Sequence, residues 1–378
     1  MRFLRKDKVG KTIIIISDLH LGAGVMFNGS RNYLEDFHSD KELVDFLQYY
    51  SRGGYLNSAV ELIINGDFVD LLAVPFVPFF DDEYWSEEAA IAKLKLIVNA
   101  HLEVFKALDE FLSTKEKSIQ YILGNHDGEL CFPSLQEYLL NQFSEKNRPR
   151  FIIRTNEDAG YSPYPGIVLM HGHEYEVAHN FKAAKAIHET AEGKKYFVPP
   201  WGSYYVTRVI NKFKEERDYI NAVRPIKKFL IYGFIYDTLF TVRFLFATCF
   251  YFLMVRFLYF FRKGGRDIKK VFMDAAQELE LFQDYEELTQ EYFTKNPQTI
   301  ALIVGHTHDP IIRTNSTGNT FINTGTWTKM YNLGFVKSSS DGPLLTYAKI
   351  NIYHDEKAGL DLALNVWKGT STLPFQEF

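Results

Sequence analysis

The chain has 378 residues, of which 46% are apolar and 24% are charged, so it can bury a full core and exceeds the usual size of one simple domain. We therefore expect one large domain that carries an insertion, or two domains. The net charge of −5, from 42 basic and 47 acidic residues, gives no overall electrostatic reason to expect a polyanionic partner.

The N-terminus and the two cysteines indicate in which cellular compartment the protein is expected. The first residues are basic, but the apolar run that follows is only four isoleucines long, too short for the apolar region of a signal peptide. Cys131 and Cys249 have no partner at a metal-binding spacing, so a disulfide framework is not implied. We expect a cytoplasmic protein.

Short apolar runs that end in polar turns recur along the chain, and each is typical of a buried strand. Between them lie helical patterns at 41–50 and 87–112, where apolar residues recur every three or four positions. This alternation predicts a layered α/β core. The runs are Ile13–Ile16, Leu62–Ile64, Tyr121–Leu123, Ile167–Met170 and Leu302–Val304.

The middle of the chain, residues 177–296, has helical patterns but none of these strand-and-turn units. Its net charge also differs from that of the rest of the chain. Residues 182–270 hold 18 basic and 7 acidic residues, a net charge of +11, which leaves −16 for the remainder. We therefore predict a core made of residues 1–176 and 297–378, interrupted by a helical insertion at 177–296.

The last part of the chain, after Asn315, changes to short β-rich segments separated by Gly, Ser and Asp turns. These segments are Phe321–Asn323, Leu345–Ile352 and Leu362–Trp367. The simplest interpretation is a sheet that returns onto the core.

Oxygen and imidazole donors follow each of the five predicted strands of the core. Because open α/β sheets bind ligands at the carboxyl ends of their strands, these donors can meet at one point and form a metal centre. The five segments are Asp18-Leu19-His20, Gly66-Asp67, Gly124-Asn125-His126-Asp127, His171-Gly172-His173 and Gly305-His306-Thr307-His308.

A pair of cations about 3.5–4 Å apart needs a bridging carboxylate and terminal donors on each side, and it can then hold both oxygens of a displacement at phosphorus. Asp67 is the natural bridge. In Asp18-x-His20 and His306-x-His308 both side chains point the same way if the backbone is extended. Each motif alone is weak, because a lone Gly-Asp or His-x-His is more often a turn; the five in order are specific.

The ordered set resembles the calcineurin-like metallophosphoesterase superfamily, with its pattern D-x-H, GD, GNH[D/E], H and GHxH, over Ile13–Asp309. The resemblance implies a four-layer α/β/β/α sandwich with a helical insertion. It also implies two ligand sets: one metal takes Asp18, His20, Asp67 and His308, and the other takes Asp67, Asn125, His171 and His306. All are oxygen or nitrogen donors, which suit Mn, Fe, Zn or Mg; the resemblance favours manganese.

By the same resemblance, His126 contacts the substrate phosphate, as a general acid or a donor to the developing charge, with Asp127 as its orienting partner. His173 is interpreted as a histidine that supports the ligands or lies on the substrate side, in preference to one that binds a metal directly. Two interpretations of Asp70 remain open: it belongs to the motif Gly-Asp-x-x-Asp, or it is a carboxylate at a helix N-terminus. His101, His179 and His188 lie in predicted helices and are interpreted as surface or core histidines.

An apolar, aromatic segment at 225–264 contains only Asp237, Arg243 and Arg256 as charged residues between basic borders. Its longest uncharged run, between the two arginines, is 12 residues, whereas about 20 are needed to span a bilayer. Two interpretations remain. The segment is either a buried hairpin of the insertion or a surface that dips into one leaflet; the many Phe, Tyr and basic residues favour the second.

Within the superfamily the sequence is most similar to the UDP-2,3-diacylglucosamine hydrolase group, in Gly305–Pro310, in Gly325-Thr326-Trp327 and in the position of the insertion. It departs from that group at His126, where arginine is typical, and at His173, where aspartate is typical. The resemblance implies a phosphoesterase or pyrophosphatase, peripheral on the cytoplasmic face of a membrane, that acts on a lipid-linked phosphate.

Two rival functions remain open at this point. A nuclease or soluble phosphodiesterase of the same superfamily would need a basic, aromatic groove near the site, and the acidic remainder of the chain argues against nucleic acid. A non-catalytic scaffold of the same fold would have no need of the complete donor set. The sequence gives no indication of the oligomeric state.

Overall fold

The computed structural model describes residues 9–75, 81–155, 160–176, 178–224, 226–262, 285–332, 342–354, 360–370 and 375–377. Val177, Pro225, Lys263 and Gly264, which bound the predicted insertion and the apolar segment, lie outside the described residues. The first eight residues also lie outside them.

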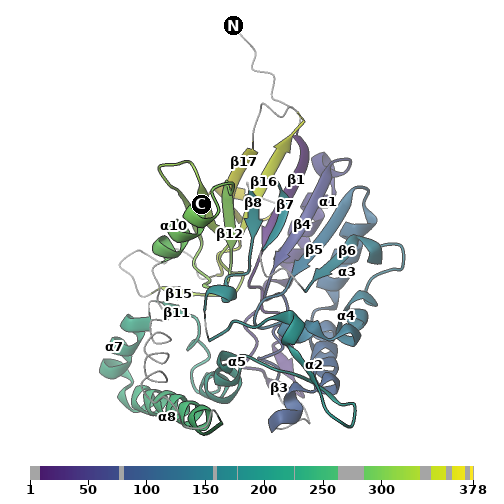
Figure 1. Ribbon diagram of the computed structural model, residues 1–378. Helices are drawn as coiled ribbons and strands as arrows, with labels where there is room; N and C mark the ends of the chain where they lie inside the picture. The colour runs from purple at the N-terminus through teal and green to yellow at the C-terminus, as the bar shows by residue number, and fades with distance from the viewer. Residues whose placement is uncertain are drawn as a thin grey trace.

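The larger sheet has seven strands in the order β18-β17-β16-β1-β4-β5-β6 (Figure 1). The four strands β1, β4, β5 and β6 are parallel, and β16, β17 and β18 add an antiparallel flank. Their bounds are β1 Val9–Ile16, β4 Ala59–Asn65, β5 Lys117–Ile122, β6 Phe151–Arg154, β16 Thr346–Tyr353, β17 Leu360–Trp367 and β18 Phe375–Glu377.

The smaller sheet has five strands in the order β13-β14-β12-β8-β7. Its centre is parallel, with β12 between β14 and β8, and both edge strands are antiparallel. Their bounds are β7 Tyr161–Tyr164, β8 Ile167–Leu169, β12 Ala301–Val304, β13 Ile311–Thr314 and β14 Thr320–Asn323. The predicted return of the chain after Asn315 therefore adds strands to both sheets.

Alternate residues of the central strands face two different cores. Ile13 and Ile15 of β1 lie with Ile303 of β12 in a fully buried cluster that joins the two sheets. Ile14 and Ile16 face the opposite side and join the core beneath the helices, because side chains alternate along a strand. The isoleucine run of β1 is therefore buried on both faces.

Helices cover the outer face of each sheet and complete four layers, α/β/β/α, as expected. On the larger sheet these are α1 Asp40–Ser51, α2 Glu87–Ala100, α3 Leu102–Ser113 and α4 Pro133–Leu140. On the smaller sheet, α10 Tyr285–Lys295 packs Phe293 against Leu302, Val304 and Phe321. The predicted helical stretch 87–112 is two helices, because the chain breaks at His101, whose buried ring bonds Asp40 at 2.6 Å.

The insertion is mainly helical, as predicted, and its helical hairpin covers about residues 229–254. A continuous helix is formed by α5 Trp201–Tyr205, a π-helical turn Val206–Ile210 and α6 Asn211–Lys214, followed by α7 Ile226–Tyr236 and α8 Thr238–Arg262. Short strands that the sequence did not predict also occur in this region: β9 Ile187–Glu189, β10 Lys195–Phe197 and β11 Val223–Arg224, which pairs with β15 Tyr331–Asn332. Near the N-terminus, β2 Met26–Phe27 and β3 Ser30–Arg31 form a small hairpin.

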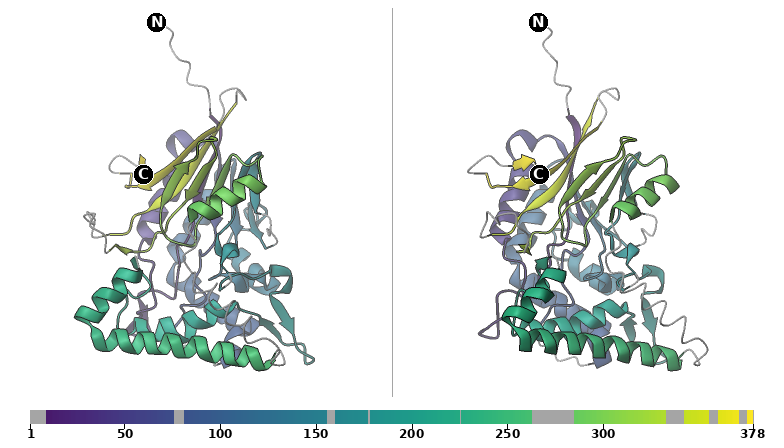
Figure 2. Two further views of the ribbon diagram at one scale, coloured as in Figure 1. Left: turned by 60° about the vertical axis from the view of Figure 1, so that its left-hand side comes forward. Right: turned by 90° about the vertical axis from the view of Figure 1, so that its left-hand side faces the viewer.

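The long helix α8 lies across one end of the molecule, apart from the two sheets (Figure 2). One side of α8 is buried: Phe240, Phe244 and Tyr251 pack against Val209 and Ile220. The other side is not, and the described part of the hairpin is therefore not a fully buried one. We call its exposed apolar side chains the outer apolar face: Ile231, Tyr232, Phe234, Ile235, Tyr236, Leu239, Val242, Phe246, Phe250 and Leu253.

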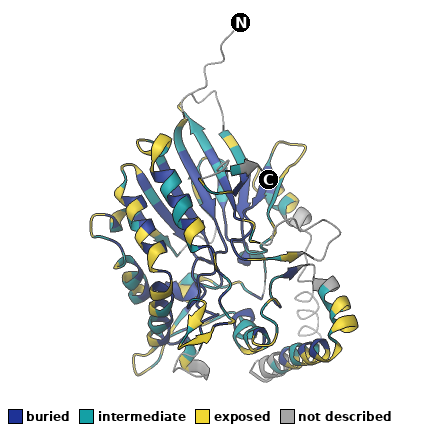
Figure 3. Cartoon of the chain, turned by 180° about the vertical axis from the view of Figure 1, so that it is seen from behind, coloured by how far each residue is buried: buried dark blue, intermediate teal, exposed yellow. Residues whose placement is uncertain are grey.

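Exposure on the outer apolar face is high for such residues, at 83% for Tyr236, 73% for Leu239 and 72% for Phe246. Figure 3 shows the exposed colour concentrated on α7 and interspersed along α8. Within the described residues, no helix has both the length and the apolar character needed to cross a bilayer.

Candidate metal centre

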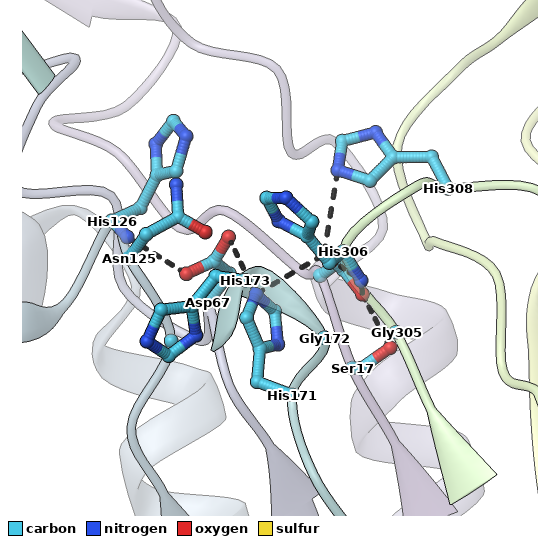
Figure 4. Close-up of polar contacts among 12 residues, drawn as sticks. Ser17, Asp67, Asn125, His126, His171, Gly172, His173, Gly305, His306 and His308 are labelled. Atoms are coloured by element: carbon cyan, nitrogen blue, oxygen red, sulfur yellow. Dashed lines mark hydrogen bonds and ion pairs between the residues drawn. The ribbon is translucent and has the colours of Figure 1, made fainter. Parts of the chain in front are cut away.

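All five predicted donor segments meet where β1, β4 and β5 of one sheet end beside β8 and β12 of the other (Figure 4). Backbone bonds hold the segments together: the Asp18 N–H donates to Gly66 O at 3.1 Å, and the Gly305 N–H donates to His171 O at 2.8 Å. The site therefore spans the junction of both sheets.

The first group of donors is Asp18, His20 and His308, whose ligand atoms lie within 4.8 Å of one another. The Nε2 atoms of His20 and His308 are 3.1 Å apart, and His308 Nε2 is 3.4 Å from Asp18 Oδ1. Asp18 and His20 are buried and His308 is partly exposed. These are the residues expected around one metal.

The second group is Asp67, His171 and His306, again within 4.8 Å of one another. His171 Nε2 is 3.2 Å from Asp67 Oδ2, and His20 Nε2 of the first group is 3.9 Å from the same oxygen. A third group joins His20, Asp67 and His126. Asp67 therefore touches both ligand sets, as the predicted bridge requires, and it lies at the middle of the close-up in Figure 4.

Two buried atoms test whether these residues fit metal ions. His171 Nε2 and Asn125 Oδ1 are inaccessible to solvent and accept or donate no well-formed hydrogen bond, although His171 Nε2 lies 3.2 Å from Asp67 Oδ2. An unpaired buried polar atom of this kind costs about 1–3 kcal/mol, so native proteins rarely leave one without a function. A cation gives both atoms a partner, and the donor set fits two divalent ions.

Hydrogen bonds fix which ring nitrogen of three histidines faces the centre. His171 Nδ1 donates to Asn65 O at 2.8 Å, and His20 Nδ1 lies 3.1 Å from Asp70 Oδ2. His306 Nε2 lies 3.1 Å from Glu176 Oε2. Such partners set the tautomer and orientation of metal-binding imidazoles.

The backbone at the ligands is left-handed, and this corrects the extended geometry that the sequence suggested for the two Asp/His-x-His segments. Of the seven non-glycine residues with positive φ in the described parts of the chain, five are predicted ligands: Asp18 (54°), His20 (55°), Asp67 (51°), His306 (69°) and His308 (65°). Each such residue costs of order 1–3 kcal/mol, and this strain concentrates at functional sites.

Two glycines leave no room for any side chain. A Cβ on Gly124 would collide with the Asp67 carboxylate, and a Cβ on Gly66 would collide with the His171 ring. Gly66 also has a φ of 86°, which favours glycine. These positions let the chain pass directly beside the ligands.

His126 lies at the centre, but its partner is not the one predicted. Its Nδ1 lies 2.9 Å from Asp70 Oδ1, and its backbone N–H donates to Asp67 Oδ1 at 2.8 Å. Burial alone would lower the pKa of His126, but the carboxylates of Asp70 and Asp67 raise it. Asp70 therefore belongs to the site, where it holds both His20 and His126.

Asp127, the predicted orienting partner of His126, supports the loop instead. Its carboxylate accepts from Phe68 N at 2.9 Å, from Tyr121 Oη at 2.6 Å and from Gly124 N at 2.6 Å. Burial, together with the nearby charge of Asp67, raises the pKa of Asp127 to about 7. The sequence placed Asp127 correctly beside the site and gave it the wrong contact.

Glu176 and His179 also lie at the centre, and the sequence singled out neither as a site residue. The His179 ring lies 5.3 Å from that of His306, and its Nδ1 is 3.4 Å from Asn125 Nδ2. Burial and the charge of His306 lower the pKa of His179 to about 3, so its ring is neutral at physiological pH. The only available signal was their position just after His171, on the segment that leads into the insertion.

The other histidines differ in position. His173 is buried, stacks on Phe181 with ring centroids 5.2 Å apart, and has its ring 5.4 Å from that of His171. His101 is a core histidine. His188 is exposed on the short strand β9.

We predict that Glu176→Gln weakens one metal site. Glutamine cannot supply the carboxylate that fixes the His306 ring, and loss of such a partner typically costs 10- to 100-fold in metal affinity. Calorimetric titration of metal-free protein with Mn²⁺ should show one site weakened by this factor and the other retained. Glu189→Gln, whose exposed carboxylate makes no ion pair with His306, serves as the control; equal affinities in both variants would remove Glu176 from the site.

Comparisons with known proteins agree with this geometry at the level of the family. A family model described as calcineurin-like phosphoesterase matches residues 11–310. No curated protein sequence matches the chain significantly.

Solved structures give only distant likenesses. A dimetal phosphatase from Danio rerio is 13% identical over 98% of this chain and 99% of its own, with a TM-score of 0.40. An archaeal phosphodiesterase is 12% identical over 93% of this chain and 99% of its own, with a TM-score of 0.32. Zinc-bound Vps29 from Entamoeba histolytica is 20% identical over 24% of this chain and 44% of its own, with a TM-score of 0.17.

Proposed function

Because this chain belongs to the calcineurin-like phosphoesterase family and is a metal-dependent phosphoesterase, we propose that its substrate is a lipid-linked phosphate or pyrophosphate, hydrolysed at a membrane surface. The observation that carries the proposal is the outer apolar face of α7 and α8, which the insertion adds to a complete metal centre.

Two overlapping sets of donors would hold the metal ions. One set is Asp18, His20, Asp67 and His308, and the other is Asp67, Asn125, His171 and His306. When bound, two divalent cations lower the pKa of the attacking water and neutralise charge on the phosphate. Manganese is our first choice, and Fe, Zn and Mg suit the same donors.

His126 is proposed to assist the leaving oxygen. Asp70 holds the Nδ1 side of the ring, so Nε2 is the nitrogen left to give a proton or a hydrogen bond. The side chain is 17% exposed, which leaves this nitrogen reachable by a substrate. Neighbouring carboxylates raise the pKa of His126, which favours the protonated ring that a general acid requires.

The outer apolar face supports a membrane location. Monomeric soluble proteins rarely expose a contiguous apolar patch of this kind unless it contacts a partner or a membrane. Aromatic residues such as Tyr236, Phe246 and Phe250 suit the membrane interface, and basic residues at its borders attract anionic lipid at about 1 kcal/mol each. The sequence places Lys227 and Lys228 at the start of α7 and Arg262 at the end of α8.

We predict that serine at Tyr236, Phe246 and Phe250 releases the protein from membranes. Wild-type protein should sediment with anionic liposomes, and the triple variant should remain largely in the supernatant. Hydrolysis of bis(4-nitrophenyl) phosphate should persist in the variant, because these side chains are exposed and their loss opens no core cavity.

The control for this experiment is a double variant with Leu56→Ser and Leu102→Ser, two exposed apolar residues outside the insertion. It should sediment like the wild type. Wild-type protein that does not sediment with anionic liposomes would refute the membrane proposal but not the assignment as a phosphoesterase.

A nuclease or soluble phosphodiesterase of the same family is the alternative. One observation favours it: a cavity with basic and aromatic residues in its lining lies between the core and the insertion. A non-catalytic scaffold would have no need of this donor set, which is complete and mostly buried. We continue to expect no nucleic-acid partner and a cytoplasmic, peripheral location.

A further inference from the structure

A cavity of about 810 Å³ lies between the core and the insertion. One wall comes from the β2–β3 hairpin and the residues after it, and from the segments 74–75 and 84–85 of the core. The opposite wall is the π-helical turn and α6, including Arg208, Asn211 and Lys212. Figure 1 shows β3, α2 and α5 around this part of the molecule. The volume is typical of a site for a small organic ligand.

The cavity adjoins the metal centre along the chain that follows Asp70. Val74 lines the cavity four residues after Asp70, so their Cα atoms are at most about 14 Å apart. Two side chains of the cavity hold the intervening backbone: Tyr84 Oη donates to Leu71 O at 3.0 Å, and Asn211 Nδ2 donates to Leu72 O at 2.7 Å. A substrate that reaches about this distance from the metals would therefore come to the cavity.

The two walls are joined by buried polar contacts. Lys214, with a side chain only 1% exposed, donates from Nζ to Asp36 Oδ2 at 2.7 Å and to Leu34 O at 3.3 Å. Asn221 Nδ2 donates to the same Asp36 oxygen at 2.9 Å. The π-helical turn beside them is a rare conformation that is frequent at functional sites. The cavity is thus built into the fold.

The charge of the lining favours an anion. The lining contains three basic residues, Arg31, Arg208 and Lys212, and one acidic residue, Glu215. Arg31 is already paired with Asp218 at 2.8 Å. Arg208 and Lys212 form no ion pair with any described carboxylate. They are four residues apart on one helix, where two like charges repel, so an anion between them removes an unfavourable interaction. Arg208 also lies over the Tyr204 ring, 5.4 Å from its centre.

We propose that this cavity binds the part of the substrate beyond the hydrolysed phosphate, and that this part carries a second phosphate or similar anion on an apolar or ring-containing group. Arg208 and Lys212 bind the anion, and Phe27, Tyr33 and Tyr84 contact the organic group. The proposal rests on the phosphoesterase function. A recess of this volume, with two cations that form no ion pair with a described carboxylate, suits a small molecule better than a nucleic-acid strand, which needs an extended basic groove.

A matched pair of chromogenic substrates tests the proposal. Thymidine 5′-(4-nitrophenyl phosphate) and its 3′-phosphorylated form share the reporter and the sugar, and differ only in the second phosphate. Wild-type protein should show the higher kcat/KM for the 3′-phosphorylated form. In a double variant with Arg208→Met and Lys212→Met this preference should fall by about 2- to 25-fold, since each exposed ion pair contributes up to about fivefold in binding. Lys185→Met, which removes an exposed charge outside the cavity, should keep the preference.

Direct binding separates failure of this proposal from failure of the proposed function. Thymidine 3′,5′-bisphosphate should bind metal-free wild-type protein more tightly than thymidine 5′-phosphate, and the double variant should lose the difference, whether or not either ester is hydrolysed. Equal binding of both nucleotides to all variants would overturn the proposal. Tighter binding of a ten-residue oligothymidylate than of the bisphosphate, with a steep salt dependence, would overturn it in favour of a nucleic-acid strand.

Discussion

Replacing Asp67 by alanine is expected to abolish both metal binding and hydrolysis. The Asp67 carboxylate lies within reach of both ligand sets, 3.2 Å from His171 Nε2 and 3.9 Å from His20 Nε2. It is also ready to bind cations: burial alone would raise the pKa of Asp67, but His171 and His126 lower it well below its usual range. Without it, both sets lose the carboxylate that the two metal ions would share.

We expect kcat/KM for bis(4-nitrophenyl) phosphate to fall by more than about 10³-fold, which exceeds the loss of a single charge-stabilising donor. Metal analysis of purified wild-type protein should give close to two ions per chain, and the variant should hold neither tightly. Asp361→Ala, at an exposed position of strand β17, is the control and should keep both ions. An active, metal-loaded Asp67→Ala protein would refute the assignment of the centre.

The second large effect is expected for His126→Ala, which should keep the metals and lose the chemistry. His126 does not hold the ligand residues in place through its ring, which bonds only Asp70. Loss of a general acid or of a donor to the developing charge lowers kcat by roughly 10²- to 10⁴-fold. Metal content and the thermal melting temperature, measured beside kcat, should change little.

Asp70→Asn provides the matched comparison for His126. It keeps the shape of the side chain but weakens the hold on both the His126 and His20 rings, so it should lower kcat and also weaken one metal site. A His126→Ala protein that loses its metals, or that fails to fold, would make His126 a structural residue.

The sequence could predict that the candidate ligands lie together, because each of them is local to a strand. Asp18, Asp67, Asn125, His171 and His306 follow directly after buried apolar runs, and parallel strands bring such ends together whatever lies between them. The β-rich end of the chain and the helical insertion were predictable for a similar reason, since both show as a change of residue pattern.

The supporting contacts were not predictable, because they depend on side chains that meet only in the folded protein. Asp127 is next to His126 in sequence, yet Asp70, 56 residues away, is the carboxylate that meets its ring. Glu176 meets His306 across the start of the insertion for the same reason. A helical pattern in the sequence likewise could not show the break at His101, which depends on a contact with Asp40 at the start of another helix.

Backbone conformation at the ligands was the other feature hidden from the sequence. The donors at Asp18 and His20 are presented by left-handed residues, whereas the spacing alone suggested an extended segment. Aspartate and histidine tolerate this conformation better than β-branched residues do, but their presence does not require it. The outer apolar face was recognisable as an apolar segment, although its division into a buried and an exposed side was not.

The metal centre joins residues that leave the ribosome far apart in time. The backbone N–H of His306 bonds to Asp18, 288 positions earlier, and β1 pairs along one edge with β16, whose last partner is Tyr353. At roughly 5–20 residues per second, the last ligand emerges about 15 to 60 seconds after the first. Until then β1 has an unpaired edge, and the Asp18 and Asp67 carboxylates lack both their cations and their later neighbours. A nascent or truncated chain that stops before His306 is therefore a candidate for aggregation and for binding by chaperones. Metal binding is correspondingly one of the last steps in the synthesis and folding of this enzyme.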